Sequence, residues 1–148
     1  MYEFHTTRRI EFSDTDMAGI AHFSRFFVFM ESAEHDFLRS LGAPIHCEYE
    51  GIELGWPRVA ASCQYLEPAR LGDVLDIRLL VRRKGRSSLT YDFEFRRGDT
   101  KVAEGRVTSI CCAFGVSRGK PAPLQSMAIP ASLADRIGEA PHDAAAQT

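Results

Sequence analysis

Apolar residues recur every three or four positions between residues 23 and 41. They are Phe23, Phe26, Phe27, Met30, Ala33, Phe37, Leu38 and Leu41. This spacing is typical of a helix with one buried face. Ser24 suits its N-cap and Gly42 suits the position just after its end. Val28 and Phe29 widen the apolar stripe, so we expect a sheet to wrap around this helix.

After Pro57 the apolar pattern changes to a period of two, which is typical of strands with one buried and one wet face. Turn residues divide this half into strands near residues 58–68, 74–83, 87–97 and 101–115, and a further strand near residues 4–12 precedes the helix. Residues 107–114 are apolar at almost every position, which predicts that the strand containing them is central. One helix and five antiparallel strands predict an α+β fold.

A chain of 148 residues with 45% hydrophobic content suits one hydrophobic core. We predict one domain over residues 1–138, which ends in a short helix at 131–138. Residues 139–148 are small and polar and offer no anchor, so we expect a flexible tail.

The net charge of −2 argues against a nucleic-acid partner, which usually requires a basic excess. Neither a signal peptide nor an apolar run of membrane-spanning length is evident, so we expect a cytoplasmic protein with no membrane partner. The four cysteines lack paired spacing, which favours buried free thiols. We find no spacing typical of a metal site and no requirement for a cofactor.

The segment that precedes the helix carries a carboxylate at Asp16 and an imidazole at His22. The N–H groups and partial positive charge at a helix N-terminus can polarise a carbonyl oxygen, while a carboxylate attacks the carbon or activates water. These groups suit acyl transfer. Taken alone, Asp14 and Asp16 are better explained as turn residues, and Gly19 could almost equally be an ordinary loop glycine.

Four motifs occur in a fixed order along the chain. They are Asp14-Thr15-Asp16 with Gly19 and an aromatic helix ending at Leu41-Gly42, the segment from Tyr65 to Asp73, the turn from Gly85 to Leu89, and Gly119-Lys120-Pro121. Together they resemble the hotdog-fold acyl-CoA thioesterases of the 4-hydroxybenzoyl-CoA thioesterase type, over roughly residues 5–133.

This resemblance implies an antiparallel five-stranded sheet wrapped around one long central helix, with protomers joined edge to edge in a homodimer or homotetramer. It implies hydrolysis of an acyl-CoA thioester to a free acid and coenzyme A. Asp16 matches the family's nucleophile or general base, and the main-chain N–H of Phe23 matches its thioester-polarising donor. Gly19 would let the backbone approach the ligand, and Asp14 would serve the strand end.

Two other side chains near this segment keep alternative interpretations. His22 lies one position before the family's usual histidine, so it either positions water or the thioester, or packs as a structural histidine. Glu31 is a second acidic candidate, because a related hotdog branch uses a helical glutamate, but exposure to solvent or to a partner explains it more simply.

The turn between the predicted strands at residues 74–83 and 87–97 is basic. We call residues 82–88 the basic turn; its candidate ligand-binding residues are Arg82, Arg83, Lys84, Arg86, Ser87 and Ser88. A solvated hairpin is the ordinary explanation. In a coenzyme A thioesterase, however, the nucleotide phosphates need such cations and hydroxyl donors.

Two alternatives to hydrolysis remain. A hotdog domain could instead dehydrate or hydrate an acyl thioester, although those enzymes use a histidine with an acid in an arrangement that does not map well here. It could also be a non-catalytic acyl-CoA-binding module.

Overall fold

The computed structural model describes residues 1–45, 47–114, 116–117, 120–121 and 124–144. Its helical elements are the 3-10 turn η1 (Phe12–Asp14), α1 (Arg25–Ser40) and α2 (Ala131–Ala134). Its long strands are β1 (Glu3–Arg9), β4 (Arg58–Tyr65), β5 (Val74–Lys84), β6 (Ser88–Arg97) and β7 (Thr100–Ile110). Its short strands are β2 (Cys47–Tyr49), β3 (Ile52–Gly55), β8 (Cys112–Ala113), β9 (Val116–Ser117), β10 (Lys120–Pro121) and β11 (Gln125–Ser126).

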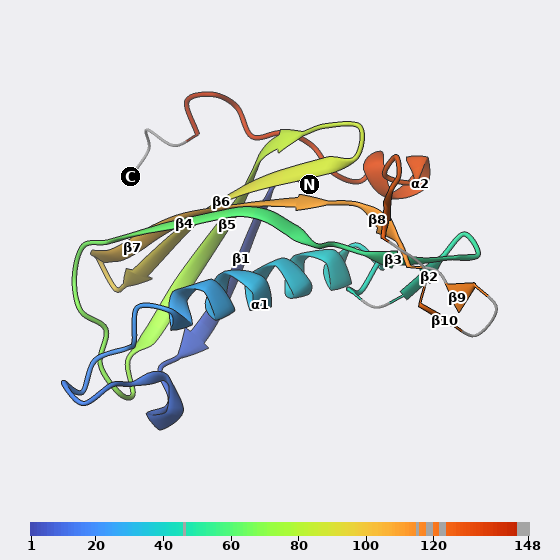
Figure 1. Ribbon diagram of the computed structural model, residues 1–148. Coiled ribbons are helices and arrows are strands. Elements are labelled where there is room, and N and C mark those ends of the chain that lie inside the picture. Colours follow the sequence, from blue (N-terminus) through green and yellow to red (C-terminus); the bar gives the residue numbers. More distant parts are fainter. Residues whose placement is uncertain (46, 115, 118–119, 122–123, 145–148) are drawn as a thin grey trace.

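The five long strands form one antiparallel sheet in the order β1-β5-β6-β7-β4, and α1 runs along one face of it (Figure 1). This arrangement confirms the predicted α+β fold with one long helix and a five-stranded sheet. The predicted bounds of α1 and of the long strands differ from those observed by up to five residues, and β5 and β6 match most closely.

The apolar periods produce this packing directly. On α1 the buried positions include Phe26, Met30 and Phe37, and on β6 the alternate residues from Leu89 to Phe95 are fully buried. Gly105 on β7 permits the closest approach of helix and sheet, because a Cβ there would lie 2.5 Å from Met30 Sδ. The core therefore lies between α1 and the inner face of the sheet.

The strand predicted to be central is not central. β6 is the middle strand, whereas β7 lies between β6 and the edge strand β4. The predicted strand also ends early: Cys111 donates its N–H to Ser87 O (2.7 Å) and accepts from Met127 N–H (2.9 Å), and β8 then joins a second sheet. That sheet, in the order β11-β8-β3-β2, was not predicted, because its strands are too short for a clear period.

The end of the chain folds back against β5. Ala140 is buried and donates its N–H to Val81 O (2.8 Å), and the Glu139 carboxylate accepts from Lys84 N–H (2.8 Å). Residues 139–144 thus have anchors that their sequence did not reveal, and residues 145–148 of the predicted tail lie outside the described residues. Gly119 of the fourth motif also lies outside them.

All four cysteines are free; Cys111 and Cys112 are buried, while Cys47 and Cys63 are half-buried. Burial, with the Cys112 thiol nearby, raises the pKa of Cys111 to about 11. None of the helices in the described ranges is both long and apolar enough to cross a bilayer. Within the same ranges, no group of three metal-ligating side chains comes together.

Candidate active site

The segment between η1 and α1 folds as a short hairpin. We call residues 15–23 the Asp16 loop. Thr15 bridges Ala21 in antiparallel fashion, and Asp16 N–H donates to Ile20 O at 2.9 Å. Gly19 adopts a φ of +75°, a conformation that other L-residues seldom take, and this allows its N–H to reach Asp16 O at 3.0 Å. Gly19 therefore makes the bend that was predicted for it.

The Asp16 carboxylate is exposed at the tip of this hairpin. Its Oδ1 accepts the N–H of Ala18 at 2.9 Å, an interaction that fixes the direction of the carboxyl group. Its Oδ2 has no partner in the described part of the chain. One oxygen of Asp16 is thus held in place and the other is available to a substrate or water.

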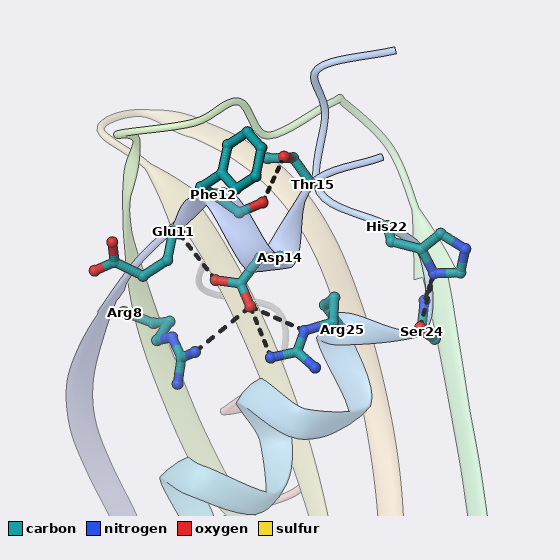
Figure 2. Close-up of polar contacts among 8 residues, drawn as sticks. All are labelled: Arg8, Glu11, Phe12, Asp14, Thr15, His22, Ser24 and Arg25. Atoms are coloured by element: carbon teal, nitrogen blue, oxygen red, sulfur yellow. Dashed lines mark hydrogen bonds and ion pairs between the residues drawn. The ribbon is translucent and has the colours of Figure 1, made fainter. Parts of the chain in front are cut away.

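Asp14, two residues earlier, lies in a completely different environment (Figure 2). Its side chain is fully buried; Oδ2 accepts Glu11 N–H at 2.9 Å, and Oδ1 accepts Arg25 Nε and Nη2, each at 2.9 Å. Arg8 Nη2 lies 3.6 Å from the same Oδ1. We call these four residues the Asp14 cluster. It joins the end of β1, the start of the Asp16 loop and the first residue of α1.

The pKa of Asp14 is lowered by this cluster. Desolvation by itself would raise it, but the Glu11 N–H and the two guanidinium groups together outweigh desolvation. A carboxylate fully occupied in this way cannot also attack a substrate. The buried position therefore agrees with the structural role that the sequence predicted for Asp14.

The Asp16 loop ends at Phe23, immediately before α1. The Phe23 side chain is 61% exposed, and its main-chain N–H has no hydrogen-bond partner among the described residues. Ser24 occupies the N-cap position, but its Oγ contacts His22 Nδ1 at 2.7 Å and does not cap the helix. Arg25 N–H instead donates to His22 O at 2.9 Å and Phe27 N–H to Ser24 O at 3.2 Å, whereas the Phe23 N–H is available to an external acceptor.

His22 is half-buried beside the same helix start. Its ring lies against the Phe23 ring, with centroids 4.5 Å apart, and its Nδ1 contacts Ser24. No carboxylate pairs with this imidazole in the described ranges, so the histidine–acid pair of a dehydratase is not assembled here. The His22 main-chain N–H donates to Asp14 O at 2.7 Å, whereas its ring points away from the Asp14 carboxylate (Figure 2).

The basic turn divides into occupied and available cations. Arg82 Nε binds Asp92 at 2.8 Å, and Lys84 Nζ donates to the carbonyls of Ala134 (3.0 Å) and Ile137 (2.7 Å). Arg83 and Arg86, in contrast, are exposed and have no side-chain partner in the described part of the chain. Only these two arginines are thus free to bind phosphate.

The basic turn and the Asp16 loop lie at opposite ends of the sheet within one protomer (Figure 1). The loop contacts the start of β5, since Ile20 bridges Arg70 and Ala21 N–H donates to Ala69 O at 2.7 Å. The basic turn begins in the last residues of β5 at its other end, and the whole strand of 11 residues extends over about 33 Å. The predicted site residues therefore form two separate groups.

A cavity of about 390 Å³ lies on the face of the sheet that points away from α1. Of the predicted site residues it includes only Arg82. Its charged side chains bind one another, because Asp92 accepts from both Arg82 and Arg106 at 2.6–3.1 Å. This surface is an ion-paired outer face and does not contact the Asp16 loop.

Glu31 and Glu34, both on α1, also differ in how far they are buried. Glu31 is exposed and lies 3.5 Å from His35, as expected for a surface acid. Glu34 is fully buried and accepts from Arg58 Nη2 and Ser109 Oγ, each at 3.0 Å; desolvation raises its pKa. The sequence pattern did not single out Glu34.

Two contacts at the Asp16 loop were missed by sequence reasoning. Arg25 was not among the predicted site residues, yet it binds Asp14. Tyr65, at the end of β4, donates its hydroxyl to Phe23 O at 2.8 Å. Asp14 and Arg25 are 11 positions apart, and Tyr65 binds a main-chain atom 42 positions away. A local sequence motif therefore gives no signal for either contact.

A five-stranded antiparallel sheet wrapped around one long helix, with an aspartate loop directly ahead of that helix, defines the hotdog-fold class of thioester hydrolases. The chain belongs to the thioesterase superfamily, whose sequence model matches residues 18–104 and thus more than half of its 148 residues. Family membership confirms the enzyme class predicted from the sequence, a thioester hydrolase.

Individual relatives agree with this assignment. The chain is 29% identical to a 1,4-dihydroxy-2-naphthoyl-CoA hydrolase of Thermosynechococcus vestitus over 106 residues, which cover 70% of this chain and 72% of the relative. A solved gentisyl-coenzyme A thioesterase is 27% identical, with a TM-score of 0.75 over 88% of this chain and 99% of the other. A 4-hydroxybenzoyl-CoA thioesterase variant solved with 4-hydroxybenzoyl-CoA has the same fold. Its TM-score is 0.80 at 21% identity, over 93% of this chain and 100% of the other.

Proposed function

We propose that this protein hydrolyses acyl-CoA thioesters to a free acid and coenzyme A. One observation carries the proposal: the Asp16 loop presents a carboxylate with an available oxygen and, at the start of α1, a Phe23 N–H without a partner. These are the two groups that acyl transfer needs, a nucleophile or base and an oxyanion donor.

In the proposed reaction the thioester carbonyl oxygen accepts the Phe23 N–H. The partial positive charge at the N-terminus of α1 stabilises the negative charge that develops on that oxygen. As a general base, Asp16 removes a proton from water, whose oxygen attacks the carbonyl carbon; the carbon–sulfur bond breaks, the coenzyme A thiolate takes up the proton, and the hydroxyl of water remains on the acyl group. As a nucleophile, Asp16 itself attacks the carbon, and the thiolate leaves and is protonated. The resulting acyl-aspartyl anhydride is then hydrolysed by water, which releases the free acid and restores the Asp16 carboxylate.

The available cations Arg83 and Arg86 suit the phosphates of coenzyme A. They lie about 33 Å along β5 from the Asp16 loop of their own protomer. A second copy would remove this separation. If two copies of the edge strand β4 paired antiparallel, the sheet of one would be reversed relative to the other, and the basic turn of the second copy would approach the Asp16 loop of the first.

The β4 edge is suited to such pairing. It bonds only to β7, and Val59 on it is 61% exposed. An unpaired edge strand of eight residues offers a row of free N–H and C=O groups to another chain. We therefore propose a homodimer joined at β4, in agreement with the edge-to-edge assembly that the family resemblance implies.

Relatives indicate which acyl groups to test first. Those whose names state a substrate include a 1,4-dihydroxy-2-naphthoyl-CoA hydrolase and a gentisyl-coenzyme A thioesterase, and both names denote aromatic acyl groups. Aromatic side chains also lie next to Phe23 in this chain, since the Tyr65 hydroxyl donates to Phe23 O and the Tyr65 ring packs edge-on against Phe26 with centroids 5.5 Å apart. We infer that an aromatic acyl-CoA is the substrate class.

Thiol release measured with a chromogenic disulfide tests the proposal, over a panel of aromatic, short, long and branched acyl-CoA substrates. Asp16→Asn should fold normally and release thiol at least about 100-fold more slowly, the usual scale for losing a general base. An unchanged rate would reject the role of Asp16. Tight acyl-CoA binding without any thiol release by the wild type would favour a binding module, and double-bond formation from a hydroxyacyl thioester would favour a dehydratase.

A further inference from the structure

The Tyr65 phenol is the only side chain that hydrogen-bonds the main chain of Phe23 within the described ranges. Its hydroxyl donates to Phe23 O at 2.8 Å, across 42 positions of sequence. This bond links the end of the edge strand β4 to the turn that precedes α1. It therefore acts on the same residue whose N–H is the proposed oxyanion donor.

The main chain of Phe23 has few other restraints. Its side chain is 61% exposed, so packing does little to hold it. The preceding peptide plane is fixed at His22 O, which accepts Arg25 N–H at 2.9 Å, and the following plane is fixed at Phe23 O by Tyr65. The Phe23 N–H lies in the first of these planar units. Because both planes meet at Phe23 Cα, the Tyr65 bond to the second plane limits how far the first can turn about that atom.

The Tyr65 side chain is 46% exposed, and one ring contact with the core orients it. Its ring packs edge-on against Phe26, and the buried Phe26 ring packs in turn against Phe95 with centroids 5.3 Å apart. Desolvation, together with the Cys63 thiol, raises the pKa of Tyr65 to about 12. The hydroxyl consequently keeps the proton that it donates throughout the pH range of a thioester assay.

We propose that Tyr65 is a positioning residue for the reaction, which holds the Phe23 N–H in the direction that the thioester oxygen requires. This inference rests on the proposed thioesterase function. Complete removal of an oxyanion donor typically lowers kcat 100- to 1000-fold. Loss of its alignment alone should cost less, so we expect Tyr65→Phe to lower kcat about 10-fold with KM changed less than about twofold, because the bond matters most in the transition state.

A purely structural role would give another result. If Tyr65 only fastened β4 to α1, its loss would remove one ordinary hydrogen bond, lower the Tm slightly and leave kcat unchanged. Tyr49→Phe is the matched control, because the Tyr49 hydroxyl lies 2.8 Å from Ser132 Oγ, on the second sheet. The two variants delete the same atom, and only the Tyr65 variant should lower kcat.

A double-mutant cycle makes the test specific. Phe23→Pro removes the donor N–H, so Tyr65→Phe should have no further effect on kcat in that background if it acts through this N–H. The inference would be overturned if the two substitutions lowered kcat in the double variant by the product of their separate factors. It would also be overturned if Tyr65→Phe, Tyr49→Phe and the wild type had equal kcat values. If Phe23→Pro does not fold, the comparison of the two tyrosine variants decides alone.

The outcome is separable from that of the proposed function. An active wild type, an inactive Asp16→Asn variant and a fully active Tyr65→Phe variant would overturn the positioning role and leave the thioesterase standing. A wild type that releases no thiol from any acyl-CoA in the panel would overturn both proposals.

Discussion

Asp14 and Asp16 are chemically identical and two positions apart, so exchanging each for asparagine gives a direct test of what burial does. Asp14→Asn should destabilise the protein, whereas Asp16→Asn should not. The reason is that Asp14 is fully buried with three charged or main-chain donors around it, whereas Asp16 is exposed and bonds only Ala18 N–H. Asparagine at position 16 can still accept that bond through its amide oxygen.

The magnitude follows from the contacts of the Asp14 cluster. The carboxylate accepts Glu11 N–H on one oxygen and the Arg25 guanidinium on the other, each at 2.9 Å. An asparagine keeps one acceptor and turns an N–H₂ group towards the other donor. A hydrogen bond to a charged group contributes about 1.5–3 kcal/mol, and a buried unsatisfied donor costs about 1–3 kcal/mol.

Solvent reduces the expected loss. The Arg25 and Arg8 side chains are 33% and 30% exposed, so water can partly replace the lost partner. We therefore expect Asp14→Asn to lower the free energy of unfolding by about 2–3 kcal/mol, equivalent to about 5–10 °C in Tm for a chain of this size. Asp16→Asn should stay within about 0.5 kcal/mol of the wild type.

The difference between wild type and Asp14→Asn should also depend on pH. The folded-state pKa of Asp14 is lowered, so its contribution to stability is fully present above the unfolded-state pKa of about 3.9 and is lost as pH falls through the folded-state pKa. The difference in unfolding free energy should thus be constant between about pH 5 and 8 and shrink in more acidic solution.

Urea denaturation followed by circular dichroism, at several pH values, measures these differences. Asp16→Asn is the matched control, because it makes the same chemical change on the same loop. The reasoning would be refuted if both variants unfolded at the same urea concentration as the wild type, or if their difference persisted unchanged at acidic pH.

Two further predictions concern the proposed donor and the basic turn. Phe23→Ala should keep kcat within a few fold, because the exposed side chain contributes little, whereas Phe23→Pro should lower kcat about 100-fold or more by deleting the N–H; equal losses in steady-state assays would contradict a main-chain role. Replacing Arg83 and Arg86 together by alanine should raise KM for acyl-CoA about 10-fold, less so at high salt, and leave KM unchanged for thioesters that lack the nucleotide. Lys84→Ala should instead lower Tm, because its Nζ holds two main-chain carbonyls.

The helix and strands were predictable where the apolar pattern repeats over a long stretch of sequence. Helix α1 and strands β5 and β6 extend over 10 to 16 residues, enough for a period to be read without ambiguity. The second sheet was missed because strands of two to four residues carry no period. Strand order was also misjudged, since the apolar run at 107–114 spans the end of β7 and the start of β8, two strands in different sheets.

The candidate site was predictable only as a set of residues. The order of motifs along the chain identified Asp16, Phe23 and the basic turn, because those residues are close in sequence to recognisable turns. It could not decide that Arg82 and Lys84 are occupied while Arg83 and Arg86 are available, since their partners come from β6 and from the end of the chain.

The sequence by itself therefore determined the class of fold, the family resemblance and the identity of the aspartate loop, because local periods and motifs encode them. Only the tertiary structure decided that Asp14 is buried, that Tyr65 reaches Phe23 O, and that the two predicted groups lie at opposite ends of β5. The physical reason is the same in each case. Burial, hydrogen bonding and distance depend on which distant segments pack together, and that information is not contained in any short stretch of the chain.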